Sequence, residues 1–212
     1  MSENFEPEGV PLEAHEVFGE NFHLAKKYAD LLARDGDLLG LIGPRELPKI
    51  WSRHILNSAV VSDLVEPGER VADVGSGAGL PGIPMAIRQP EAQFTLIEPM
   101  ERRAKWLAEV VVPTLGLKNV EVLRLRAEEA PMDSFDVVTA RAVSALPKLL
   151  KMTVPLVAPG GRILALKGSK AADEVGEARP LAKKFGLGTF EIVTVGQKLL
   201  KEPTTVVRIR LL

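Results

Sequence analysis

One segment of the sequence has residue types that suit the binding of a small ligand. Residues 71–84 read Val-Ala-Asp-Val-Gly-Ser-Gly-Ala-Gly-Leu-Pro-Gly-Ile-Pro, so that Gly75, Gly77 and Gly79 occupy alternate positions. Glycine adopts positive φ without strain and lets a ligand approach the main chain closely. Asp73 stands two residues before the first of these glycines, where its carboxylate can orient the loop or accept a hydrogen bond from a ligand amine.

A second carboxylate, Glu98, follows 23 positions after Gly75, at the end of the next apolar run. An acid at the end of the second strand of an α/β sheet is placed to bind both hydroxyls of a ribose. Glycine loops and strand-end acids also occur separately in proteins without a ligand. Their occurrence together, in this order and at this spacing, predicts a ligand of the nucleoside type.

Two kinds of ligand are candidates for this predicted site, a dinucleotide and S-adenosylmethionine. Residues 77–82 match G-x-G-x-x-G, which is weak evidence for a dinucleotide. A pyrophosphate needs free N–H groups at the start of the following helix, but Pro81 and Pro84 have no backbone N–H. The Asp73 carboxylate would also repel the negatively charged pyrophosphate. S-adenosylmethionine has no phosphate and carries a cationic amine and sulfonium, so the residues favour it as the cofactor.

The reaction is limited by what the sequence lacks. There is no Cys, so the thiolate that activates pyrimidine carbons for methylation is missing. The segment after the fourth predicted strand, residues 139–143, contains no polar-Pro-Pro-aromatic sequence for an exocyclic amine. A free lone pair such as guanine N7 is the simplest remaining acceptor, and it requires no general base. Catalysis would then rest on proximity and alignment. Arg141 could bind a guanine edge, phosphates or the cofactor carboxylate.

The elements that position these residues alternate along the chain. Strands are predicted at 70–74, 94–97, 120–125, 135–139 and 162–166, and helices at 82–88, 101–115, near Glu128 and at 146–157. Strands that alternate with helices indicate βαβ units and a parallel sheet. Pro113 is expected to end or kink its helix. After a helix at 171–185, strands at 189–195 and 204–211 have too short a connection for a crossover, so they should pair antiparallel.

Helical periodicity dominates the N-terminal part, with helices predicted at 13–34 and 47–65. Residues 1–66 are therefore interpreted as a helical extension that packs on an S-adenosylmethionine-binding domain formed by residues 67–212. Residues 1–50 carry 10 acids and 5 bases, which leaves a surplus of four positive charges on residues 51–212. That surplus is weak evidence for a polyanionic partner, and a solvated surface is the better explanation of it.

Composition narrows the class of protein further. The 212 residues carry a formal net charge of −1 and are 46% hydrophobic, which argues against disorder. The acidic start Met1–Asn4 does not resemble a secretory signal, and no apolar run is long enough for a membrane span. The spacing of the three histidines builds no metal site. The sequence thus predicts a cytoplasmic protein without a membrane anchor or a metal.

Several motifs resemble those of the RsmG (GidB) family, bacterial guanine-N7 methyltransferases of small-subunit ribosomal RNA. The resemblance rests on residues 73–84, with the long Leu-Pro-Gly-Ile-Pro extension of the loop, and on four motifs in the family's order: Trp-Ser-Arg-His-Ile-Leu at 51–56, Arg-Ala-Glu-Glu at 126–129, Ala-Arg-Ala at 140–142 and Ala-Leu-Lys-Gly at 165–168. It implies a class I (Rossmann-like) methyltransferase sheet of about seven strands, S-adenosylmethionine as the methyl donor, and a guanine N7 of 16S ribosomal RNA as the acceptor.

The resemblance also implies roles for single residues. Gly75 and Leu80 would contact the cofactor, Ala127 and Glu128 would hold its adenine side, and Arg141 would contact it or lie beside it. With Asp73, Gly77, Gly79 and Glu98 from the loop and strand pattern, these residues form the expected cofactor site; no catalytic residue is assigned.

Arg53, His54 and Lys167 are the expected substrate-binding residues, although packing of His54 and a plain surface position of Lys167 are equally good explanations. Two departures from the family pattern affect the RNA contacts: Asn57 stands where the family has Asp, and residues 201–205 replace its Gly-Glu-Arg segment. The expected partner is the small-subunit RNA, naked or in an assembly intermediate, and the protein is expected to be a monomer.

Two other classes of function stay open from sequence alone. The offset G-x-G-x-x-G leaves a nucleotide-dependent oxidoreductase as one alternative. A non-enzymatic RNA-binding or assembly factor on a methyltransferase scaffold is the other, although the ligand loop is intact in this chain.

Overall fold

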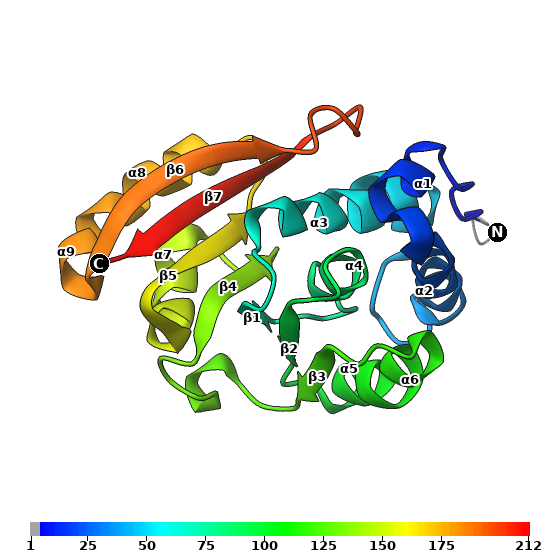
Figure 1. The fold of residues 1–212 in the computed structure, drawn as a ribbon, viewed down its shortest axis with the longest axis horizontal. Coiled ribbons are helices and arrows are strands. Elements are labelled where there is room, and N and C mark those ends of the chain that lie inside the picture. Colours follow the sequence, from blue (N-terminus) through cyan, green and yellow to red (C-terminus); the bar gives the residue numbers. More distant parts are fainter. Residues whose placement is uncertain (1–4) are drawn as a thin grey trace.

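A mixed seven-stranded sheet forms the centre of the computed structural model, which describes residues 5–212 (Figure 1). The strands are β1 (Arg70–Val74), β2 (Gln93–Ile97), β3 (Val120–Leu123), β4 (Phe135–Arg141), β5 (Val157–Leu166), β6 (Leu187–Val195) and β7 (Thr204–Leu211). Their order is β3-β2-β1-β4-β5-β7-β6. The first five strands pair in parallel, whereas β7 is antiparallel to both β5 and β6, as the short β6–β7 connection predicts.

Helical segments join these strands. They are α4 (Gly82–Arg88), the run formed by α5 (Glu101–Lys105), the π-helical turns η5 (Trp106–Val111) and α6 (Val112–Leu115), the single turn η6 (Ala127–Glu129), α7 (Leu146–Thr153) with η7 (Val154–Leu156), and α8 (Ala171–Ala178), η8 (Arg179–Leu181) and α9 (Ala182–Phe185). The predicted helix at 101–115 does not end at Pro113. Because proline lacks an N–H and crowds the preceding turn, a wide π-helical stretch immediately before it is a favourable arrangement.

The N-terminal helices differ from prediction in their detail. The predicted helix at 13–34 is divided at Gly19, where φ is 51°, into α1 (Glu13–Phe18), η1 (Gly19–Asn21) and α2 (Phe22–Asp35). The predicted helix at 47–65 is a continuous run of turns of changing width: η2 (Pro44–Lys49), the π-helical η3 (Ile50–Leu56), α3 (Asn57–Ala59) and η4 (Val60–Leu64). The acidic start Met1–Asn4 lies outside the described residues.

The strand β5 begins at Val157, earlier than the predicted 162. The intervening Pro159, Gly160 and Gly161 are types that strands usually avoid. A register shift in the β4–β5 pairing accommodates them. At Gly161 a Cβ atom would lie 2.7 Å from Cγ1 of Val157 and 2.8 Å from the carbonyl oxygen of Asp136, so only glycine fits there.

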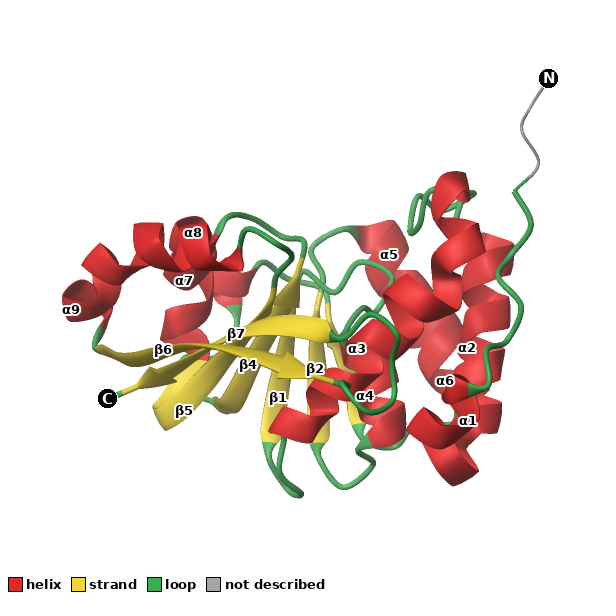
Figure 2. Ribbon diagram, turned by 90° about the horizontal axis from the view of Figure 1, so that it is seen from above, coloured by secondary structure: helices red, strands yellow, loops and turns green. Residues whose placement is uncertain are grey.

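Hydrophobic clusters cover both faces of the sheet, and Figure 2 shows helices on both sides of it. One face, with Val71 and Phe94, packs against the N-terminal helices, α4 and the α5–α6 run. The other, with Val138 and Ile163, packs against η6, α7 and α8. Residues from the N-terminal helices thus share a core with the sheet. Between residues 5 and 212 the structure contains no helix that combines the length and apolar character needed to traverse a bilayer.

Candidate functional site

The glycine loop lies between β1 and α4, at the carboxyl edge of the parallel strands. Its glycines Gly75, Gly77 and Gly79 have φ of 69°, 58° and 89°, a region that L side chains rarely adopt. They differ in surroundings. A Cβ on Gly79 would lie 2.6 Å from Cγ1 of Ile83, so Gly79 serves packing, whereas a Cβ on Gly77 would meet nothing closer than 3.9 Å. Gly77 is therefore the glycine with space beside its backbone.

Asp73 orients this loop from beneath. Its side chain is fully buried, and Oδ2 accepts a hydrogen bond of 2.9 Å from the backbone N–H of Gly82. Burial raises the pKa of Asp73 to about 7, an effect that the Gly82 N–H opposes. The other oxygen, Oδ1, is buried and has no hydrogen-bond partner among residues 5–212, so the carboxylate retains capacity for one more donor.

The start of α4 offers no free donors to an anion. The Gly82 N–H is bonded to Asp73, and the Ile83 N–H donates to the carbonyl oxygen of Gly79 at 2.7 Å. Pro81 and Pro84 have no N–H. A pyrophosphate would therefore find neither donors nor favourable charge here, which strengthens the sequence argument against a dinucleotide.

Glu98 connects the tip of β2 to the glycine loop. Its buried carboxylate accepts from the Gly77 N–H through Oε2 at 2.8 Å and from the Met100 N–H through Oε1 at 2.9 Å. Each oxygen has a further lone pair, so both bonds are compatible with additional hydroxyl donors. Through these two bonds Glu98 fixes the glycine loop to the end of β2.

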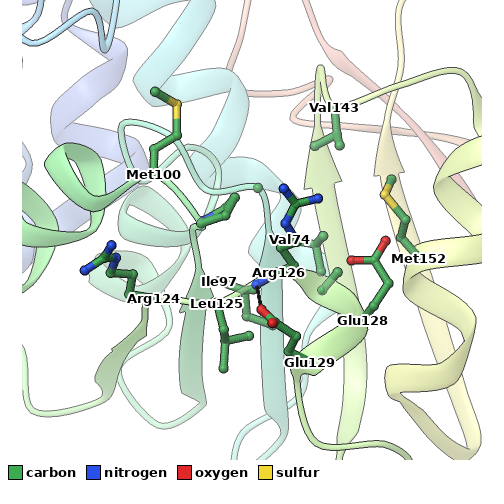
Figure 3. Close-up of a pocket in the computed structure, with 13 residues that line it drawn as sticks. Val74, Ile97, Met100, Arg124, Leu125, Arg126, Glu128, Glu129, Val143 and Met152 are labelled. Atoms are coloured by element: carbon green, nitrogen blue, oxygen red, sulfur yellow. Dashed lines mark hydrogen bonds between the residues drawn. The ribbon is translucent and has the colours of Figure 1, made fainter.

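The first cavity opens above the ends of β1, β2 and β3, with a volume of about 760 Å³ (Figure 3). Its lining residues are Val74, Gly75, Ile97, Pro99, Met100, Arg124, Leu125, Arg126, Ala127, Glu128, Glu129, Val143 and Met152. Of the predicted cofactor residues, Gly75, Ala127 and Glu128 line it. The remaining six lie in the supporting loop and strands or, for Arg141, on another cavity: Asp73, Gly77, Gly79, Leu80, Glu98 and Arg141.

Arg141 joins the end of β4 to the π-helical η3. Its Nη1 donates to the carbonyl oxygen of His54 at 3.2 Å and to Oγ of Ser58 at 3.0 Å, and Nη2 contacts Nδ1 of His54. On the far side of the imidazole, Nε2 lies 2.8 Å from Oε2 of Glu46.

This chain of contacts determines the state of His54. Burial and the charge of Arg141 lower the pKa of His54, and the hydrogen bond from His54 lowers the pKa of Glu46. A neutral imidazole that accepts from Arg141 and donates to Glu46 satisfies all three groups. His54, a predicted substrate residue, thus has both ring nitrogens engaged within the protein.

The second cavity, of about 720 Å³, lies over the ends of β4 and β5 and the start of β7. Its lining residues are Arg53, Asn57, Arg141, Ala142, Ser144, Ala145, Leu166, Lys167, Gly168, Ser169, Glu174, Glu202, Pro203, Thr204 and Thr205. The structure therefore brings together Arg53 and Lys167 of the predicted substrate residues, and adds Arg141. Lys167 is paired there, with Nζ 2.7 Å from both the carbonyl oxygen of Ser144 and Oε2 of Glu174.

Residues 141–145 form the wall between the two cavities. Val143 lines the first cavity, and its Cγ2 would lie 2.9 Å from a Cβ on Gly75, while Ala142 and Ser144 line the second. Ala142 has a φ of 54°, unusual for a residue with a side chain. Sequence reasoning assigned Arg141 but missed the other residues of this wall, because small residues after a strand carry no chemical signal. It noted the segment 201–205 without assigning a role to Glu202. The order of the strands was the one available hint.

No group of three or more histidine, aspartate or glutamate side chains within residues 5–212 is arranged to hold a metal ion.

The strand order, the terminal antiparallel hairpin and the glycine loop after β1 define the class I methyltransferase fold. Solved structures share this fold. The structure of M. jannaschii TYW2 in complex with AdoMet matches with a TM-score of 0.56 and 20% identity, covering 76% of each chain. The tRNA (m1A58) methyltransferase TrmI from Aquifex aeolicus matches with a TM-score of 0.56 and 18% identity, over 73% of this chain and 68% of that one.

Sequence comparison identifies the family. A family model described as GidB, rRNA small subunit methyltransferase G, matches residues 21–202. A protein of that name from Paenarthrobacter aurescens is 53% identical over 92% of this chain and 91% of its own, and one from Renibacterium salmoninarum is 50% identical over 95% and 94%. The chain belongs to the rRNA small subunit methyltransferase G family, as the motif resemblance implies.

Proposed function

We propose that this protein transfers the methyl group of S-adenosylmethionine to N7 of a guanine in 16S ribosomal RNA. The family name and the relatives' names support ribosomal RNA methylation. The observation that carries the proposal is the pair of cavities separated only by residues 141–145, one beside the glycine loop and one beside exposed cationic and polar side chains. Such a pair suits a donor and an acceptor that meet across a thin wall.

The first cavity fits a nucleoside with a cationic amine. Gly75, Ala127 and Glu128 line it, and the open space at Gly77 permits close approach to the backbone. We assign cofactor binding to Gly75, Gly77, Asp73, Glu98, Ala127 and Glu128. Gly79 and Leu80 would support the loop, and Arg141 would act from the wall. When bound, S-adenosylmethionine supplies an electrophilic methyl group on its sulfonium.

The chemistry of the wall agrees with an acceptor that needs no general base. Among residues 141–145 the ionisable side chain is Arg141, which stays protonated, and the nearby His54 has both ring nitrogens bonded. Guanine N7 carries a free lone pair at neutral pH, so the protein only has to align it for in-line displacement and exclude water. An exocyclic amine would require a proton acceptor, which this wall does not offer.

The substrate would be small-subunit RNA, free or within an assembly intermediate, and we propose that the protein acts on it as a cytoplasmic monomer. The direct test supplies the purified protein with methyl-labelled S-adenosylmethionine and either small-subunit particles or protein-free 16S RNA, followed by nucleoside analysis. We expect 7-methylguanosine at one position. A different methylated nucleoside, or no transfer to either substrate, would contradict the proposal.

Two alternatives lose support. The bonded N–H groups at the start of α4 oppose a dinucleotide-dependent oxidoreductase. The intact glycine loop and the first cavity oppose a purely structural assembly factor.

A further inference from the structure

The second cavity extends away from the first across the sheet. One side is the wall 141–145 at the end of β4, and the opposite side is residues 202–205 at the start of β7. Two inter-strand steps separate β4 from β7 in the sheet order, which is about 10 Å at the usual strand spacing. The cavity is therefore long enough in this direction to lie along a purine and its hydrogen-bond partner.

Most charged side chains in this cavity already have an ion-pair or hydrogen-bond partner. Lys167 is paired with Glu174, and Arg141 is bonded to His54 and Ser58. The exception among its carboxylates is Glu202, which is exposed and has no hydrogen-bond or ion-pair partner for its carboxylate within the described residues 5–212.

The backbone that carries Glu202 is held in place. With the amide of Asn57 oriented to satisfy its neighbours, Nδ2 donates to the carbonyl oxygens of Ser52 at 3.2 Å and Glu202 at 3.1 Å. Oγ1 of Thr204 donates in turn to the carbonyl oxygen of Asn57 at 2.8 Å. An aspartate at 57 could not make these donations, so the departure at Asn57 matches the local segment 202–204. An unpaired carboxylate on an anchored segment is a preformed acceptor.

We infer that the second cavity receives the target guanine and that Glu202 accepts hydrogen bonds from its N1–H and N2–H groups. This inference rests on the proposed function and names the residue that selects the base. An ionised carboxylate only accepts hydrogen bonds. Guanine alone among the four RNA bases presents two adjacent donor groups on its Watson–Crick edge. In adenine and cytosine the amino group lies beside an unprotonated ring nitrogen, and in uracil N3–H lies between two carbonyl oxygens.

The orientation that results is the one methylation requires. N7 lies on the opposite side of the purine from the N1–N2 edge, so a guanine whose edge meets Glu202 turns N7 toward the wall 141–145. Enzymes that modify a base extrude it from its stack and read its Watson–Crick edge in this manner. Arg53, whose side chain is 59% exposed at the rim of the same cavity, is placed for the phosphate of that nucleotide.

The test compares Glu202→Gln with the wild type, using RNA methylation kinetics. The isosteric amide keeps one acceptor oxygen, but its NH2 group is a donor that would face one of the two N–H donors of the guanine. We expect kcat/KM for the RNA to fall about 10- to 100-fold, the loss typical of a charged hydrogen bond, with unchanged affinity for S-adenosylhomocysteine. The matched control is Glu177→Gln on α8, the same exchange at an exposed position outside both cavities, which should keep wild-type kinetics.

A second arm changes the base. RNA carrying inosine, which lacks the N2 amine, at the mapped guanine should lower wild-type kcat/KM about 10-fold, and should lower that of Glu202→Gln much less. Wild-type kinetics for Glu202→Gln, or an equal inosine effect in both proteins, would overturn the inference. The nucleoside analysis separates the two proposals: if 7-methylguanosine forms and Glu202→Gln has no effect, only the role of Glu202 fails.

Discussion

Gly77 and Gly79 both have positive φ but differ in their surroundings, so substitutions at these two positions can be compared directly. Alanine at either position must adopt positive φ, a cost of about 1–2 kcal/mol. At Gly79 the new methyl would also collide with Ile83, adding roughly 1–3 kcal/mol of overpacking. We therefore expect Gly79→Ala to lower the free energy of unfolding more than Gly77→Ala in urea denaturation.

Ligand binding should reverse that ranking. A ligand can approach the backbone in the space beside Gly77. Relative to the stability that each variant loses, Gly77→Ala should therefore lose more affinity for S-adenosylhomocysteine than Gly79→Ala, as measured by calorimetric titration. Equal affinity of Gly77→Ala and the wild type would remove Gly77 from the binding site.

Asp73 makes folding depend on pH in an unusual direction. Its pKa rises from 3.8 in the unfolded chain to about 7 in the folded protein, so the folded state binds the proton more tightly. Between about pH 4 and 7 the stability contributed by this group falls as pH rises, by at most about 1.4 kcal/mol per pH unit, and is lost above about 7.

The isosteric variant Asp73→Asn cannot ionise. We expect its unfolding free energy to lack this component, so the difference between variant and wild type should change steadily from pH 4 to 7 and then level off. Denaturant titrations at several pH values measure it. A constant difference across that range would show that Asp73 has an ordinary pKa in the folded protein.

At the scale of elements, the contacts of His54 hold η3 against the end of β4. Replacing His54 with alanine leaves the buried part of Arg141 and the carboxylate of Glu46 without their shared partner. We expect a loss of about 1–3 kcal/mol in unfolding free energy and weaker RNA methylation, because the wall 141–145 loses its anchor. The exposed His23 on α2 is the control, and His23→Ala should change stability by less than about 0.5 kcal/mol.

The elements also show which features a sequence can predict. The alternation of apolar runs and helices located every strand, because burial between helix layers imposes that pattern. The same reasoning placed the start of β5 too late, because a glycine usually interrupts a strand. Here Gly161 is required by the close approach of Val157 and Asp136 at the register shift, which the sequence does not express. The changing turn widths from Pro44 to Leu64 likewise depend on tertiary contacts that leave no periodic signal.

The residues around the glycine loop carry a clear signal in the sequence, whereas those of the second cavity carry a weaker one. Gly75, Asp73 and Glu98 belong to short, local patterns around two strand ends. Glu202 and the wall 141–145 meet only because β7 inserts between β5 and β6. No spacing in the sequence expresses that juxtaposition. His54 was assigned to RNA from a motif, whereas its engaged ring nitrogens indicate a positioning role.

For the whole molecule, the charge distribution makes the proposed RNA binding testable. Residues 51–212 carry four more bases than acids, and the acidic surplus is confined to residues 1–50. Binding to RNA should therefore weaken as salt rises, because phosphate contacts release counterions. Arg53→Gln should lower the slope of log affinity against log salt by about 1, which filter binding at several salt concentrations measures. A salt-independent affinity would contradict phosphate contacts.

One contact spans the molecule from its first long helix to its ligand loop. The buried hydroxyl of Tyr28 on α2 donates to the carbonyl oxygen of Ala78 at 2.7 Å, between Gly77 and Gly79. Coupling between two sites is reciprocal. If the Tyr28 hydrogen bond stabilises the loop conformation that binds a ligand, ligand binding stabilises the position of α2 to the same extent. Amide protons in the middle of α2 should then exchange with deuterated solvent more slowly once the loop is occupied. The exchange rates of amide protons in a helix that does not contact the ligand would thus report ligand binding.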